Sequence, residues 1–231
     1  MILRTLYTES EVETAVRRMA DEIGFDLTSI TPVQAAGPSA APAAGKGRGR
    51  TRDRSAPRAA SAAAATAPPG LPAGVGVRPG ARTEVASTLS LERPVLIGML
   101  KGTFIFLADL ARAMKLPVDI DFMRVRMRTS ERIPDGVVEF DYEPEHSLAG
   151  RAVVVVEDVA GSGKTLRAVL ARLQAHEPRL LKVCALVRRR GYSGPPVDYV
   201  GFDVGPGWLV GYGLDDREAY RTLPGLCILE D

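Results

Sequence analysis

Apolar positions beyond residue 90 gather in short runs that alternate with segments of helical periodicity. The runs at residues 95–100 and 152–156 are nearly all apolar, which is typical of strands covered on both faces of a sheet. The remaining runs predict strands over residues 118–125, 181–187, 199–204 and 208–212, and helices over 104–111 and 165–174. Strands that alternate with helices predict an α/β fold with a doubly wound, mostly parallel sheet.

The N-terminal segment predicts an amphipathic helix over residues 9–23. Thr8 or Ser10 can cap it, and acidic residues in its first turn favour the positive end of the helix dipole. Its apolar positions recur at helical spacing: Val12, Val16, Met19 and Ile23. We therefore assign residues 1–30 to the core or to a small hood above it, and residues 91–231 to the main domain.

Residues 31–90 differ in composition from the rest of the chain. Of these 60 residues, 33 are Ala, Pro or Gly, none is aromatic, and eight basic residues accompany two acidic ones. So few large apolar side chains cannot bury enough surface to offset the entropy of ordering, which predicts a disordered basic insert. The basic run at residues 45–50 could contact RNA or acidic lipids, but a solvated insert is the simpler interpretation.

The net charge of +2 originates in this insert. Outside residues 31–90 the chain has 22 basic and 26 acidic residues, so the part expected to fold is mildly acidic. That balance does not describe a basic nucleic-acid-binding domain, and we expect no nucleic-acid partner.

Residue counts argue against several other classes of protein. The two cysteines, Cys184 and Cys227, cannot make a disulfide framework, and two histidines in the whole chain argue against a His/Cys zinc site. No apolar run approaches the roughly 18 residues that a membrane helix needs. Acidic residues also come too early for a signal peptide. We expect a soluble cytoplasmic protein with no membrane partner.

The segment that ends the 152–156 strand carries the most informative chemistry. Glu157 and Asp158 stand at the end of the strand, and a turn of small residues then opens a helix at Lys164 and Thr165. Ligands of doubly wound sheets bind at the carboxyl ends of strands. Backbone N–H groups of such a turn and the positive end of a helix bind phosphate, while adjacent carboxylates suit ribose hydroxyls or Mg²⁺.

Two alternatives accompany this interpretation. A Walker A motif needs a glycine five positions before Gly163, and that position is Asp158, so we exclude a P-loop. The simpler structural alternative is a capped strand–helix turn with two exposed acids. The residues on their own favour the phosphate site over this alternative.

The sequence Glu-Asp-Val-Ala-Gly-Ser-Gly-Lys-Thr-Leu at 157–166 resembles the phosphoribosyl pyrophosphate (PRPP) motif of type I phosphoribosyltransferases, specifically of their hypoxanthine-guanine branch. Residues 95–109 resemble the family's pyrophosphate loop, in which Leu-Lys-Gly carries a non-proline cis peptide, here Leu100–Lys101. Residues 119–123 resemble its next strand, and 198–202, 208–215 and 220–224 resemble its purine-binding hood and C-terminal tail. The likeness extends over residues 1–30 and 90–231 and implies the type I phosphoribosyltransferase fold.

The resemblance implies an activity in purine salvage, the Mg²⁺-dependent transfer of 5-phosphoribose from PRPP to hypoxanthine or guanine with release of pyrophosphate. By position, the catalytic roles fall on Lys101, Glu157, Asp158 and Arg221. PRPP would be bound by Lys101, Gly102, Glu157, Asp158, Gly161, Ser162, Gly163, Lys164 and Thr165. The base would be bound by Arg188, Trp208, Leu209 and Asp215, and the metal by Glu157, Asp158 and Asp215. The family also implies a homodimer or a homotetramer.

The sequence departs from the family at three places. Gly161 stands where the family has the Asp that acts as general base on the purine ring proton, and glycine cannot accept a proton. Met127 and Arg128 stand where the family has Ser-Tyr, on the mobile loop (here 127–146) that closes over the reacting complex. Arg188 replaces a Lys that donates to the purine 6-oxygen, and its planar fork is wider than an ammonium group.

Two functions remain open at the level of the sequence. In the first, the protein is a transferase whose acceptor needs little help with deprotonation, or which uses another carboxylate, such as Asp158 or Asp216, as its base. In the second, it is a non-catalytic PRPP or nucleotide sensor. The retained Lys101 and Arg221 favour the transferase, because groups that bind pyrophosphate matter chiefly for turnover, whereas the missing base favours the sensor.

Overall fold

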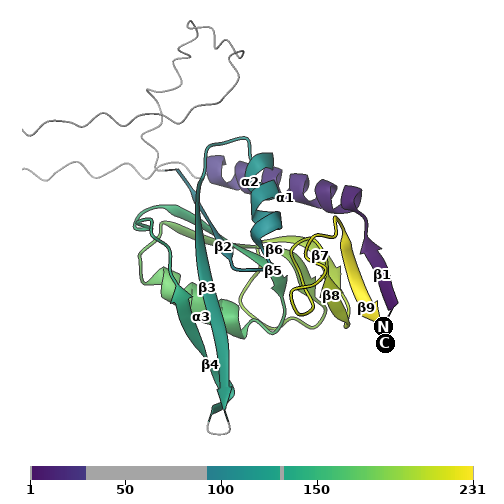
Figure 1. Ribbon diagram of the computed structural model, residues 1–231. Helices are drawn as coiled ribbons and strands as arrows, with labels where there is room; N and C mark the ends of the chain where they lie inside the picture. Colours follow the sequence, from purple (N-terminus) through teal and green to yellow (C-terminus); the bar gives the residue numbers. More distant parts are fainter. Residues whose placement is uncertain (1, 30–92, 131–132, 231) are drawn as a thin grey trace, which may run out of the picture. The chain divides into compact units, whose positions relative to one another are not determined.

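The computed structural model of the protein describes residues 2–29, 93–130 and 133–230, and the predicted insert at 31–90 lies outside the described residues. Six strands form the main sheet in the order β4-β3-β2-β5-β6-β7 (Figure 1). All neighbouring pairs in it are parallel except β3 with β4. The strands are β2 (Val95–Met99), β3 (Asp119–Ser130), β4 (Ile133–Tyr142), β5 (Ala152–Ala160), β6 (Leu180–Arg189) and β7 (Tyr199–Val204). The predicted α/β class with a mostly parallel sheet is confirmed.

Helices cover both faces of this sheet, as a doubly wound fold requires. Side chains alternate along β5, so that Val154 and Val156 join the core under α1 (Glu9–Ser29) and α2 (Phe104–Ala113). Val153 and Val155 join the core under α3 (Lys164–Gln174) on the opposite face. The continuous valine run therefore reflects a strand that has no solvent-exposed face.

A second, three-stranded sheet forms the hood, in the order β1-β9-β8, and includes residues 208–210 of the predicted hood. Residues 199–202, which the resemblance also gave to the hood, lie instead in β7 of the main sheet. Its strands are β1 (Ile2–Tyr7), β8 (Trp208–Val210) and β9 (Leu226–Glu230). The hydrophobic pattern did not predict β1 or β9, because both are short and β1 is largely exposed. Both chain ends therefore meet in one sheet beside the edge strand β8 (Figure 1).

The first helix begins with a reciprocal capping box. The Thr8 N–H and hydroxyl donate to Glu11 Oε2 at 2.8 and 2.7 Å, while the Glu11 N–H approaches the Thr8 hydroxyl at 3.4 Å. Thr8 is thus the cap, and Ser10 lies inside the helix. The helix continues to Ser29, six residues beyond the predicted end, because its apolar face packs on α2 and β7.

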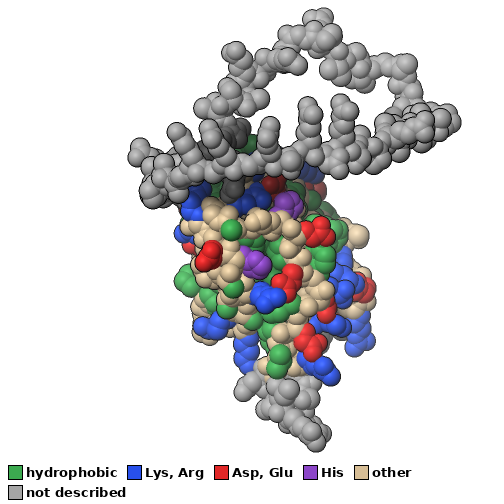
Figure 2. All heavy atoms as spheres, turned by 90° about the vertical axis from the view of Figure 1, so that its left-hand side faces the viewer, with side chains coloured by type: hydrophobic (Ala, Val, Ile, Leu, Met, Phe, Trp, Pro, Cys, Tyr) green, Lys and Arg blue, Asp and Glu red, His purple; other side chains and the backbone are tan. Residues whose placement is uncertain are grey.

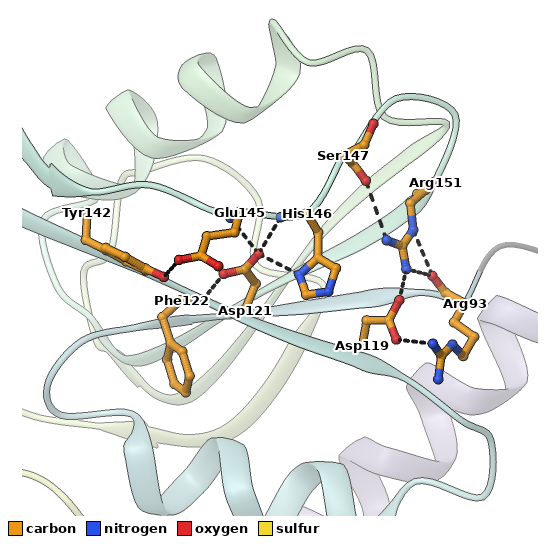
Figure 3. A network of polar contacts seen from close by, with 9 residues as sticks. All are labelled: Arg93, Asp119, Asp121, Phe122, Tyr142, Glu145, His146, Ser147 and Arg151. Carbon is orange, nitrogen blue, oxygen red and sulfur yellow. Dashed lines mark hydrogen bonds and ion pairs between the residues drawn. The ribbon is translucent and has the colours of Figure 1, made fainter. Parts of the chain in front are cut away.

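The segment predicted as a closing loop, residues 127–146, forms mostly a β-hairpin. Residues 124–130 of β3 pair in an antiparallel manner with residues 133–142 of β4, with two register shifts, so most of this polar stretch is strand rather than loop. The buried Asp121 carboxylate holds the return of this hairpin to the core (Figure 3). It accepts the backbone N–H groups of Glu145 at 2.8 Å and His146 at 2.9 Å, and it contacts His146 Nδ1 at 2.8 Å.

Charged side chains of both signs alternate on the face that carries the hairpin, with apolar patches between them (Figure 2). Cross-strand ion pairs account for part of this pattern, including Arg126 with Asp141 at 2.7 Å and Arg128 with Glu139 at 3.0 Å. This face is therefore not a uniform basic surface. Within the described part of the chain, no helix combines the length and apolar character needed to cross a bilayer.

Candidate active site

The turn between β5 and α3 leads into a helix N-terminus that has no side-chain cap from its N-cap residue. Gly163 is the N-cap of α3, with φ 75° in the left-handed region that favours glycine, and it has no side chain with which to cap the helix. The Ser162 hydroxyl approaches only the Lys164 N–H, at 3.4 Å, and the first turn holds no acidic residue. The N-terminus of α3 can therefore bind an anion through its N–H groups and its dipole.

A neighbouring loop supports this turn from outside. A Cβ at Gly163 would lie 2.4 Å from the Cα of Gly194 and 3.2 Å from the ring of Tyr192, so only glycine fits. The Tyr192 hydroxyl is itself fixed by donation to the Pro195 carbonyl at 2.7 Å. The turn is thus held in shape before any ligand arrives.

The acid pair at the end of β5, Glu157 and Asp158, lies in an environment that disfavours the ionised form of both carboxyl groups. Burial, followed by the charge of Asp158, raises the pKa of Glu157 well above its usual range. Burial also raises the pKa of Asp158, although the Val159 N–H donates to its carboxylate at 2.7 Å. Glu157 Oε2 is buried and has no hydrogen-bond partner. A buried acceptor left unpaired in this way is suited to a ligand hydroxyl or a cation.

The loop after β2 meets the acid pair directly. A Cβ at Gly102 would lie 1.6 Å from Asp158 Oδ2, so the carboxylate rests against the bare backbone of this glycine. Gly213 also packs against Gly102, because a Cβ at Gly213 would lie 2.1 Å from the Gly102 carbonyl oxygen. The Leu100–Lys101 peptide is cis, as the family resemblance implies. The end of β5 and the loop at Gly213, both distant in the sequence, therefore meet the loop after β2 at Gly102.

Cationic side chains gather at the same place. Arg221 is only 16% exposed, donates to the Gly213 carbonyl at 2.7 Å and pairs with Asp215 at 2.8 Å. Lys101 pairs with Glu218 at 2.9 Å, and Glu218 also pairs with Arg221 at 3.2 Å. Sequence reasoning selected Lys101, Asp215 and Arg221 but missed Glu218, although it lies between the last two in the chain.

The residues predicted to bind the base lie at the ends of β6 and β8. Arg188 makes a two-pronged ion pair with Asp203 of β7, at 2.8 and 2.9 Å, which raises the pKa of Arg188 and lowers that of Asp203. Trp208 is 59% exposed, so its indole is accessible for stacking. Leu209 is buried, but β8 pairs only with β9, which leaves one edge of its backbone open to a ligand.

Gly161, the position of the missing general base, has open space around it. No heavy atom lies within 4 Å of a Cβ built there, and its φ is not in the left-handed region. Neither crowding nor backbone conformation therefore requires a glycine at this position.

Mg²⁺ fits the donor set of this site. Among the described residues, no three His, Cys, Asp or Glu side chains cluster closely enough to hold a metal by themselves. Mg²⁺ commonly binds through one or two carboxylates and completes its shell with water and substrate phosphates. The unpaired Glu157 Oε2 beside Asp158 offers such carboxylate ligands.

Comparison with known proteins identifies relatives. The family model described as "Phosphoribosyl transferase domain" matches residues 81–217. Hypoxanthine-guanine phosphoribosyltransferase of Mycobacterium avium is 45% identical over 131 residues, which are 56% of this chain and 64% of that protein. The enzymes of the same name from Dictyostelium discoideum and Aquifex aeolicus are 37% and 36% identical, over 59% and 64% of this chain and 79% and 85% of their own lengths. The match thus spans less than two thirds of the mycobacterial relative.

Solved structures agree on the fold. A hypoxanthine-guanine phosphoribosyltransferase from Bacillus anthracis superposes with a TM-score of 0.68 at 24% identity, covering 100% of each chain. A point mutant of the hypoxanthine phosphoribosyltransferase of Trypanosoma cruzi, solved as a ternary substrates complex, gives a TM-score of 0.68 at 24% identity, covering 98% of this chain and 95% of its own.

Proposed function

The chain belongs to the phosphoribosyltransferase family, in its hypoxanthine-guanine branch, and from this premise we propose that it transfers 5-phosphoribose from PRPP to a 6-oxopurine. The observation that carries the proposal is the convergence on Gly102 of the acid pair, the 211–221 loop and the cis peptide. Lys101 adjoins Gly102, Arg221 donates to the Gly213 carbonyl, and the N-terminus of α3 follows the acid pair in the chain. Each group suits a different part of PRPP.

The 5-phosphate is assigned to the turn at 161–165. Its backbone N–H groups, the hydroxyls of Ser162 and Thr165, and the N-terminus of α3 donate to phosphate oxygens, and Lys164 adds positive charge. The two ribose hydroxyls are assigned to Glu157 and Asp158. Hydrogen bonds from the diol would satisfy Glu157 Oε2, which the ligand-free protein leaves buried without a partner.

The leaving pyrophosphate is assigned to Lys101, Gly102 and Arg221. In the reaction the bond from ribose C1 to the pyrophosphate oxygen breaks and a bond from C1 to a purine nitrogen forms, while the purine loses its ring proton. Positive charges beside the leaving group stabilise the negative charge that develops on it. Mg²⁺ at Glu157 and Asp158, and a second Mg²⁺ at Asp215, would add Lewis-acid stabilisation of the same oxygens.

The acceptor base is assigned to the hood. Trp208 would stack on the purine face, the open edge of β8 at Leu209 would contact the ring nitrogens, and Arg188 would donate to the 6-oxygen. Asp215 would face the purine edge. With Gly161 unable to take the ring proton, another carboxylate, Asp158 or Asp216, would have to act as the base.

The catalytic unit is assigned to residues 1–30 and 91–231. Its support is the core, in which α1 packs on α2 and β7. Excision of residues 31–90 with a short Gly-Ser bridge should leave folding and PRPP binding intact. We further assign the protein to purine salvage in the cytoplasm, as a homodimer or homotetramer, which sedimentation would test.

Turnover is the test of the activity. The protein is incubated with PRPP and Mg²⁺, in turn with hypoxanthine, guanine and xanthine, and formation of the nucleoside monophosphate is followed. Formation with one of these bases is the expected result. Binding of PRPP by calorimetry without turnover on any base would replace the proposal by a sensor function.

A further inference from the structure

Glu218 occupies an unusual place for a carboxylate. It lies between the two side chains assigned to the pyrophosphate, with Oε1 2.9 Å from Lys101 Nζ and Oε2 3.2 Å from Arg221. Both carboxylate oxygens of Glu218 are therefore engaged with a cation. Among the described residues, Glu218 is the one acid whose ion pairs reach both cations.

The loop backbone fixes this carboxylate in position. Glu218 has φ 69°, in the left-handed region that a non-glycine residue rarely adopts, and its N–H donates to Asp215 Oδ2 at 2.7 Å. Its neighbours Arg217 and Tyr220 also have left-handed φ values, of 50° and 71°. A loop that maintains three such residues directs the carboxylate toward the cations, although the side chain itself is 65% exposed and can be displaced.

Charge balance shows what this arrangement does to a ligand. Lys101 and Arg221 carry two positive charges, and Asp215 and Glu218 carry two negative ones, so the ligand-free cluster is neutral. A diphosphate that pairs with both cations therefore competes with Glu218 for them. We propose that Glu218 is an internal competitor for the pyrophosphate subsite, a positioning residue that weakens pyrophosphate binding and so assists its release. This inference rests on the proposed function.

The test is Glu218→Gln, which keeps the shape of the side chain and removes its charge. With Mg²⁺ present, calorimetry should show pyrophosphate binding about fivefold tighter than in the wild type, the gain expected from two exposed ion pairs. KM for PRPP should fall by a similar factor, while kcat stays level or falls as pyrophosphate release slows. Glu218→Asp keeps the charge on a shorter side chain, farther from the two cations. The affinity of this variant for pyrophosphate should lie between those of the wild type and Glu218→Gln.

The matched control is Glu230→Gln, which removes the same charge from the exposed pair with Arg4 and should leave pyrophosphate affinity unchanged. Equal or weaker pyrophosphate binding by Glu218→Gln would overturn the inference, since a merely structural carboxylate cannot give tighter binding when removed. A gain of the same size in Glu230→Gln would overturn it too, because the effect would then be general electrostatics. If neither the wild type nor Glu218→Gln binds pyrophosphate or PRPP, the proposed function fails and the inference fails with it. If both bind equally, only the inference fails.

Discussion

The substitution Gly161→Asp restores the carboxylate that the family has at this position and that we expect to act as general base. The structure accommodates it, because a Cβ at this position meets no heavy atom within 4 Å and the backbone is not left-handed. We therefore expect a change in the free energy of unfolding within about 0.5 kcal/mol, as for an unconstrained surface position. Any change in rate can then be attributed to chemistry rather than to folding.

The expected gain follows from what a general base contributes. Proton transfer to a positioned side chain is typically worth about 10²–10⁴-fold in rate, so kcat on hypoxanthine should rise toward that range. A carboxylate on this partly exposed turn ionises near the ordinary Asp pKa of about 3.9, so the gain should persist at neutral pH and disappear in acid. KM for PRPP should be nearly unchanged, since the phosphate turn keeps its backbone donors.

The matched control is Gly161→Asn, which has the same shape but cannot accept the proton. Both variants are compared by nucleotide formation at saturating PRPP and Mg²⁺, from about pH 5 to pH 9. An equal rise in the two variants would show that filling the space, not taking the proton, is what matters. No rise with Asp would show that another group already removes the proton, and the role given to Asp158 or Asp216 would then be strengthened.

Three further predictions concern the base and the acid pair. Trp208→Ala should weaken purine binding by about 1–3 kcal/mol, or roughly 5- to 150-fold, without lowering the Tm; as the single Trp, it should also report that binding by fluorescence in the wild type. Arg188→Ala should raise KM for a 6-oxopurine by roughly 10-fold or more, as loss of a charged hydrogen bond does, and KM for PRPP should not change; a rise in both would contradict its assignment to the base. Glu157→Gln should abolish turnover yet not destabilise the ligand-free protein. Because folding raises the pKa of Glu157, the free energy of unfolding of the wild type should fall as pH rises from the usual Glu pKa toward the raised one. Glu157→Gln should make that fall shallower. Identical pH dependences of the two proteins in chemical denaturation would contradict the raised pKa.

The central strands of the main sheet could be predicted because burial on both faces requires a continuous run of apolar residues in the sequence. The valine run at 153–156 predicted a strand, and the small residues after Asp158 predicted the start of α3 to within one residue. The hairpin was not predicted, since β4 mixes Asp, Gly and Glu with valines and is stabilised by cross-strand ion pairs. Such pairs depend on which residues face each other, and the register is set by the fold rather than by local pattern.

The site shows the same division between local and tertiary information. The turn at 161–165 lies in one segment, so its residues and their spacing were enough to propose a phosphate site there. The contact between Gly102 and Asp158 joins residues 56 positions apart, and no pattern within either segment predicts that a Cβ there would collide with the carboxylate. Glu218 could have been found from its position between Asp215 and Arg221, but its role depends on reaching Lys101, 117 residues away.

Two of the three departures from the family fall on one side of the reaction. Gly161 and Arg188 stand at positions assigned to the acceptor base, whereas Lys101, Glu157, Asp158 and Arg221, which are assigned to PRPP and its leaving group, are all retained. Cations that pair with the diphosphate of PRPP would serve a sensor as well as an enzyme, but a sensor would gain nothing from a carboxylate that competes with the diphosphate for them. The asymmetry is explained if the reaction at ribose C1 is preserved and the way the base is held and loses its proton has changed.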